Sequence, residues 1–247
     1  MYRKIDMEQW PRKEHYLYYT DKLKVEFTMT AQLRVEKLLA YCHRRGYRFY
    51  AAFIALASQV VNSLENFRMF KNDKGELCVW DYVVPNYTIF HKDDQTFSDC
   101  WSEYCEDPAR LYQTIVADME RFKDTKGIKA RDGQPANFFC ISCAPWVHFT
   151  GFSTRNTQGE PQYFPIITAG KYEKDGERLL MPVNVTLAHA VCDGYHVGLF
   201  FQRLQQAIDE IGEEQTVDEI GLRRELDETG QEKAEDEMEQ EAMKEQG

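Results

Sequence analysis

A histidine and an aspartate four residues apart lie in the segment with the clearest chemical potential, Leu187-Ala-His-Ala-Val-Cys-Asp-Gly-Tyr-His196. A neutral imidazole such as His189 can accept a proton near pH 7. Asp193 can hold the following turn, either by capping the next helix or by pairing with an arginine. Gly194 allows the chain to turn sharply. On spacing alone, a packed core histidine followed by an N-capping aspartate is the favoured interpretation.

The elements around this segment must present His189 at the end of a strand. A Lys-Asp-Gly turn at 174–176 predicts a hairpin between strands 166–172 and 179–189, and helical spacing resumes after Gly194. In the residues before this segment, the spacing of apolar residues predicts a strand at 23–28, a helix from an N-cap at Thr30 to Gly46, and helices at 49–64 and 111–122. It also predicts strands at 77–84 and 87–91, which meet at Pro85-Asn86, and a strand within 137–152. Strands joined both by hairpins and by helices predict an α/β (α+β) two-layer sandwich, a mixed sheet with helices packed on one face.

The charge of the chain is concentrated at its C-terminus. The net charge of the 247 residues is −11, and residues 213–247 hold 14 acidic and 4 basic side chains, a net of −10, so the preceding residues sum to about −1. We therefore expect a folded domain over 1–212 and an acidic tail over 213–247 that is solvated or partly helical. The acidic balance argues against a nucleic-acid partner.

Hydropathy and cysteine usage bear on location. No run of 18 apolar residues exists, which predicts no membrane partner, and the first ten residues lack the apolar region of a signal peptide. Seven scattered cysteines indicate free thiols in a reducing, cytoplasmic setting. Cys140 and Cys143 lie in a strand-like run, where residues three apart point to opposite faces. With no second pair of this spacing, no metal site is expected.

Several collinear segments together resemble the chloramphenicol acetyltransferase family over residues 1–211. They are the His-x-x-x-Asp-Gly segment, Trp10–His15, Cys78–Asp81 with Phe90-His91, Ile141–Trp146 and Phe164–Tyr172. The resemblance implies an acetyl-CoA-dependent O-acetyltransferase that transfers acetyl directly to a small-molecule hydroxyl, with chloramphenicol the leading acceptor. It also implies the family's two-layer fold and a homotrimer with active sites between subunits.

The resemblance assigns roles to individual residues. His189 is implied as the general base, Ser142 as the hydrogen-bond donor to the oxyanion, and Thr168 as the holder of a nearby water. Arg12 matches the arginine that pairs with the motif aspartate, Asp193. The acceptor pocket is implied to include Tyr18, Tyr19, Val25, Phe97 and Thr154, and the CoA contacts Lys171 and Tyr172.

Three departures from the family pattern leave the acceptor open. Ala188 stands where a second histidine is usual, the 153–160 loop is polar, and Lys129 stands near a usual aromatic position. Weaker apolar walls favour another small alcohol as one alternative. A non-catalytic trimer that binds an acyl-CoA or another ligand is the second. A dihydrolipoamide acyltransferase core is a third, disfavoured because no lipoyl domain is recognised upstream of the core.

Overall fold

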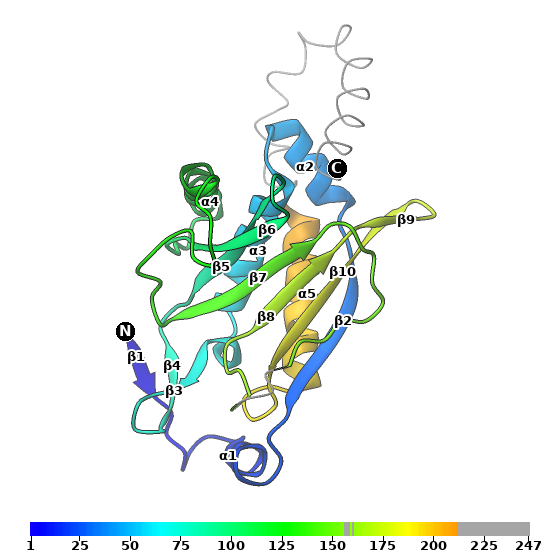
Figure 1. Ribbon diagram of the computed structural model, residues 1–247. Coiled ribbons are helices and arrows are strands. Elements are labelled where there is room, and N and C mark those ends of the chain that lie inside the picture. Colours follow the sequence, from blue (N-terminus) through cyan, green and yellow to red (C-terminus); the bar gives the residue numbers. More distant parts are fainter. Residues whose placement is uncertain (156–158, 160, 212–247) are drawn as a thin grey trace, which may run out of the picture.

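The protein is built around a seven-stranded mixed sheet with helices on one face (Figure 1). The computed structural model describes residues 1–155, 159 and 161–211. The strands are β1 (Tyr2–Lys4), β2 (Glu26–Arg34), β3 (Met69–Lys71), β4 (Leu77–Trp80), β5 (Val84–His91), β6 (Thr96–Trp101), β7 (Phe138–Ala144), β8 (Ile166–Gly170), β9 (Glu173–Asp175) and β10 (Arg178–Ala188). The helices are α1 (Lys13–Leu17), α2 (Glu36–Arg45), α3 (Phe49–Asn62), α4 (Pro108–Phe122) and α5 (Gly194–Glu210), with a π-helical turn at Tyr18–Lys22 and a 3₁₀ turn at Glu65–Arg68.

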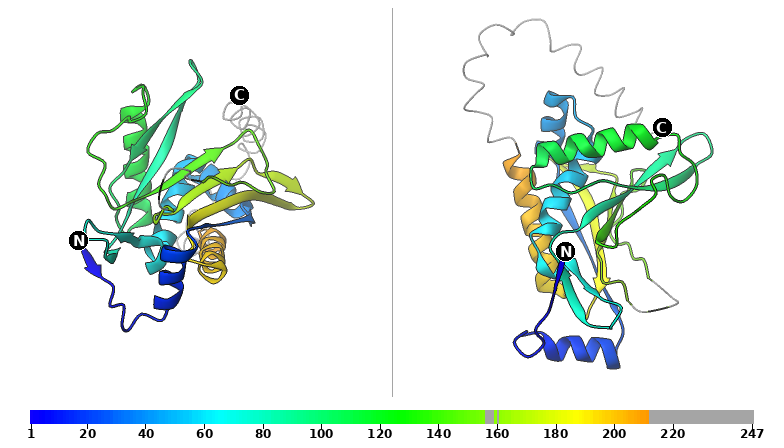
Figure 2. Two further views of the ribbon diagram at one scale, coloured as in Figure 1. Left: turned by 60° about the horizontal axis from the view of Figure 1, so that its bottom comes forward. Right: turned by 90° about the vertical axis from the view of Figure 1, so that its left-hand side faces the viewer.

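The large sheet has the order β2-β10-β8-β7-β5-β6, with β9 paired to β10. The β5–β7 and β7–β8 pairs are parallel and the other pairs are antiparallel. A small antiparallel sheet, β1-β4-β3, lies apart from it. The second view of Figure 2 shows α3 and α5 on one side of the large sheet. The mixed two-layer sandwich predicted from the sequence is therefore confirmed.

The apolar core lies between the helices and one face of the large sheet. Helix α3 is almost entirely apolar and buried, while α5 buries one stripe that contains Val197, Phe200, Leu204 and Ile208. On β10, alternate residues such as Val183 and Val185 are fully buried beneath these helices. Burial of this apolar surface is the main stabilising term of the fold. Among the described residues, no helix is both long enough and apolar enough to cross a membrane.

Two expected boundaries were wrong. Thr30 is not an N-cap but lies inside β2, and the next helix begins at Glu36 after Val35. The alternation of Phe27, Met29, Ala31 and Leu33 has the period of a strand, and pairing with β10 extends that strand to Arg34. Pro85 and Asn86 do not separate two strands, since both lie within β5. Gly46 does end α2, in the left-handed conformation that glycine favours.

The loop after β7 packs closely against Gly170, at the end of β8. A Cβ atom at Gly170 would lie 2.7 Å from side-chain atoms of Phe149 and Pro182 and 2.8 Å from the carbonyl oxygen of Val147. We expect Gly170→Ala to lower the free energy of unfolding by about 2–3 kcal/mol, because the backbone of the loop must move. Urea denaturation measures this change. Gly198→Ala is the control: a Cβ there meets nothing within 4 Å, inside α5, and should stabilise by about 0.5–1 kcal/mol.

Candidate active site

His189 directly follows β10, and its surroundings fix the direction of its ring. The backbone N–H of His189 donates to the carbonyl oxygen of Val25 at 3.0 Å, which extends the β2–β10 ladder. The ring stacks on Tyr19, with centroids 3.9 Å apart and planes 19° apart, and Phe27 packs against it at 5.1 Å. Its Nδ1 lies 2.8 Å from the carbonyl oxygen of Cys192. A carbonyl only accepts, so Nδ1 carries the hydrogen and the Nε2 lone pair of the neutral ring can take a proton.

Asp193 holds the loop behind His189 through three partners. One carboxylate oxygen pairs with Arg12, whose guanidinium also donates to the carbonyl oxygen of His189 at 3.4 Å. The other oxygen accepts from the backbone N–H of Tyr195 at 3.0 Å and from Nδ1 of His196 at 2.8 Å. Asp193 therefore caps α5 and pairs with an arginine at the same time. The two roles that the sequence left open are both present.

These contacts change the acidity of Asp193. Burial acts to raise its pKa, but hydrogen bonds from His196 and Arg12 outweigh burial and lower the pKa from 3.8 to about 2. Because the pKa is lower in the folded state, the ionised form stabilises the fold above about pH 4. That contribution is lost as the pH falls from about 4 to about 2.

Replacing Asp193 with asparagine tests this ion pair. We expect Asp193→Asn to lower the free energy of unfolding by about 1–3 kcal/mol, because Arg12 loses a charged partner in a partly buried place. Urea denaturation at one protein concentration should show that the variant loses a constant amount of unfolding free energy, relative to wild type, from pH 8 to pH 5. The loss should be smaller below pH 4. If the difference in the free energy of unfolding between wild type and variant grows as the pH falls below 5, Asp193 is not the group whose pKa is lowered.

Ser142 and Thr168 form the centre of a row of polar side chains on the sheet face opposite the helices. They are register partners on β7 and β8, with hydroxyl oxygens 3.4 Å apart. Thr168 is also the register partner of Asn184, which donates to Thr30 at 3.0 Å. The β5–β7 pairing ends at Tyr87 and Ile141, where the Tyr50 hydroxyl donates to the Ile141 carbonyl oxygen at 3.2 Å and lies 3.5 Å from the Thr88 hydroxyl. Thr88 is the next residue of β5, and it pairs with Asp99 on β6. The row across the sheet is Asp99, Thr88, Ser142, Thr168, Asn184 and Thr30.

One chain does not bring His189 and Ser142 together. Asn184, which neighbours the Ser142–Thr168 pair, precedes His189 by five residues of strand, about 16 Å at 3.3 Å per residue. A general base and an oxyanion donor must both lie within about 3 Å of the same reacting group. Within one chain, His189 and Ser142 therefore cannot act on the same reacting group.

Of the other residues implied by the resemblance, three lie close to His189 and four lie on other parts of the chain. Tyr18, half exposed, packs edge-on against Tyr19 at 5.2 Å, and both lie with Val25 near His189. The other four lie away from His189 along the chain: Phe97 is half exposed on β6, Lys171 and Tyr172 directly follow β8, and Thr154 has a buried hydroxyl with no hydrogen-bond partner. Residues 156–158 and 160 of the polar loop lie outside the described residues.

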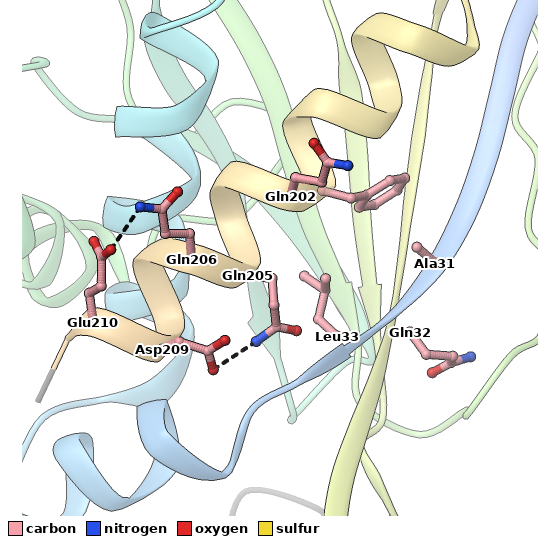
Figure 3. A pocket seen from close by; sticks show the side chains of 9 residues that line it. Ala31, Gln32, Leu33, Gln202, Gln205, Gln206, Asp209 and Glu210 are labelled. Carbon is pink, nitrogen blue, oxygen red and sulfur yellow. Dashed lines mark hydrogen bonds between the residues drawn. The ribbon is translucent and has the colours of Figure 1, made fainter.

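A pocket of about 650 Å³ lies elsewhere, between α5 and the edge of β2 (Figure 3). None of the residues assigned above lines it. Beside it, the Gln205 side chain accepts the backbone N–H of Arg34 at 2.8 Å and donates to the carbonyl oxygen of Arg34 at 3.2 Å. Gln205 therefore fills one position along the edge of β2.

Sequence reasoning missed His196 and Asn184. His196 is one of three partners of Asp193, and its place three residues after the aspartate, in the first turn of a helix, was the available signal. Asn184 is 1% exposed in a strand that is otherwise mainly apolar. A polar residue in such a strand signals a required hydrogen bond, because an unpaired buried amide is costly.

Comparisons with known proteins give consistent results. The family model described as chloramphenicol acetyltransferase matches residues 1–205. A chloramphenicol acetyltransferase of Clostridium perfringens is 37% identical over 202 residues, 82% of this chain and 92% of that protein. One of Proteus mirabilis is 38% identical over 206 residues, 83% of this chain and 94% of that protein.

Solved structures show the same fold. A chloramphenicol acetyltransferase structure matches with a TM-score of 0.73 at 21% identity, over 84% of this chain and all of the other. The dihydrolipoamide acetyltransferase of Azotobacter vinelandii matches with a TM-score of 0.59 at 17% identity, over 80% of this chain and 86% of the other. At these identities the structural likeness bears on the fold alone.

Proposed function

This chain belongs to the chloramphenicol acetyltransferase family, and we propose that it transfers the acetyl group of acetyl-CoA directly to a hydroxyl of a small molecule, with chloramphenicol the leading acceptor. The observation that carries the proposal is the fixed ring of His189. The bond from Nδ1 to the Cys192 carbonyl leaves Nε2 as the basic nitrogen. The stack on Tyr19 holds the ring in place.

In the proposed reaction, Nε2 of His189 removes the proton of the acceptor hydroxyl while the hydroxyl oxygen attacks the thioester carbonyl of acetyl-CoA. The negative charge that forms on the carbonyl oxygen is met by the hydroxyl of Ser142, with Thr168 beside it. Collapse of the tetrahedral intermediate expels the CoA thiolate, which takes the proton from the imidazolium of His189. Asp193 and Arg12 do not touch the reacting atoms but hold the loop that carries the base.

The separation of His189 from Ser142 supports a site shared between copies of the chain. We propose a homotrimer in which His189, Tyr18, Tyr19 and Val25 of one subunit face the Ser142 side of its neighbour. The resemblance to the family supports the number three. Light scattering should give three times the mass of the chain, and a monomeric mass would contradict the shared site.

The other assignments follow from the same proposal. Lys171 and Tyr172, close after Thr168 along the chain, are proposed to contact CoA, while Phe97 and Thr154 contribute to the acceptor side. The catalytic domain is proposed to span 1–212, and the acidic segment 213–247 to be dispensable for acetyl transfer. Free thiols at all seven cysteines, three of them only partly buried, support a cytoplasmic location.

The test is release of the CoA thiol from acetyl-CoA with and without chloramphenicol. Release that requires both the protein and chloramphenicol supports the proposal. Release only with other alcohols would keep the reaction and change the acceptor. No release with any alcohol, together with binding of acetyl-CoA, would favour the non-catalytic ligand-binding alternative.

A further inference from the structure

A charged pair lies at the end of the polar row, two strands from Ser142. The Lys129 ammonium donates to Asp99 at 3.0 Å and to the side-chain oxygen of Gln134 at 2.9 Å. Asn86 donates to the same oxygen of Gln134 at 2.6 Å. The backbone N–H and carbonyl of Asp99 bond to Ile128 and Ala130, both at 2.8 Å, so Lys129 is held beside β6.

This charged pair faces the same side of the sheet as Ser142. Asp99 pairs with Thr88 on β5, and β5 is the neighbour of the strand that carries Ser142, so at least two strand spacings of about 4.8 Å separate Asp99 from Ser142. Cys140 also lies close to the pair. Burial, and then the charge of Asp99, raise the pKa of the Cys140 thiol to about 12.

The two ends of the polar row differ in how far they are covered by other parts of the chain, and this bears on which way a bound acceptor extends from Ser142. On the β10 side, the carbonyl oxygen of Phe152 accepts from Asn184 at 2.7 Å, and Phe149 packs on Gly170, so the loop after β7 covers that end. On the β6 side, Phe97 is half exposed. A molecule whose reacting hydroxyl lies near Ser142 can therefore extend over β5 and β6 toward the Lys129–Asp99 pair, at least about 10 Å away.

We propose that Lys129 and Asp99 determine acceptor specificity, and that they favour alcohols whose far end carries an uncharged, strong hydrogen-bond acceptor over alcohols with an apolar or nitrophenyl end. This inference rests on the proposed function. Two of the three N–H donors of Lys129 are used by Asp99 and Gln134, and the third can bind such a group. The pair carries no net charge, so it gives no general advantage to an ionised acceptor.

The experiment compares chloramphenicol with its analogue in which a methylsulfonyl group replaces the nitro group, because the sulfonyl oxygens accept hydrogen bonds more strongly. The measured quantity is the ratio of kcat/KM for the two compounds. We expect the wild-type protein to favour the sulfonyl compound. In the double variant K129M with D99A, which removes both charges together, the ratio should move about tenfold toward the nitro compound.

The control variant is K126M with D93A, which makes the same two substitutions at another ion pair. It should leave the ratio unchanged, and thermal melting shows whether either double variant is folded. If the double variant at 129 and 99 does not fold, K129M alone provides the same comparison. A ratio that does not move while both compounds are acetylated overturns the specificity proposal alone. If the wild-type protein acetylates neither compound, the proposed acceptor fails and the specificity proposal falls with it.

Discussion

His189→Ala is expected to lower kcat for acetyl transfer by roughly 10²–10⁴-fold, the usual contribution of a positioned general base. The base must remove a proton while the acceptor oxygen attacks, and the only basic nitrogen that the His189 ring offers is Nε2, since Nδ1 is committed to the Cys192 carbonyl. The KM values should change much less, because the proton moves only as the reaction proceeds.

The matched control is His43→Ala, which removes an exposed histidine from α2. It should keep the wild-type kcat. Steady-state kinetics with acetyl-CoA and the acceptor, together with a circular dichroism spectrum, separate loss of the base from loss of the fold. If His189→Ala keeps a kcat within threefold of wild type, another group must be the base, and the proposed mechanism is wrong.

Ser142→Ala is expected to lower kcat by about 10²-fold with little change in KM, because the hydroxyl meets a charge that exists only in the transition state. Thr168 stays in place, but its hydroxyl is 3.4 Å from that of Ser142 and cannot occupy the same position. Ser63→Ala, which removes a serine hydroxyl at the end of α3, is the control and should keep the wild-type kcat. Equal losses in both serine variants would show that Ser142 has no special role.

A mixture of the two inactive variants tests the shared site. When Ser142→Ala and His189→Ala chains are co-expressed, a subunit with an intact His189 meets a neighbour with an intact Ser142 at about one quarter of the interfaces in a randomly mixed ring. We expect about a quarter of the wild-type activity to return. If both residues acted within one chain, mixing would restore nothing.

The sequence predicted the parts of the site that depend on local spacing. The turn at 174–176, the alternation along β10 and the cap at Asp193 together place His189 between a strand and a helix, as the structure confirms. Arg12 lies 181 residues away and could not be paired by spacing. Its pairing with Asp193, implied only by resemblance, is present in the fold.

The polar row could not be predicted, because its members come from six strands and meet only through the register of each pair. Thr88 and Asn184 carry no motif, and a shift of one residue in any register would move them to the helix-covered face. The boundary at Thr30 was wrong for a related reason. Threonine is both a frequent N-cap and a frequent strand residue, and pairing with β10 decided between the two.

The amide of Gln205 has a consequence for association with other chains. At Arg34 it forms the two hydrogen bonds that a neighbouring strand would otherwise form. Exposed strand edges are templates for aggregation, and proteins protect them with charges, bulges or a covering element. A side chain from α5 serves that purpose here. Any strand that adds to β2 must stop before Arg34, so runaway edge-to-edge growth is blocked at this end of the sheet.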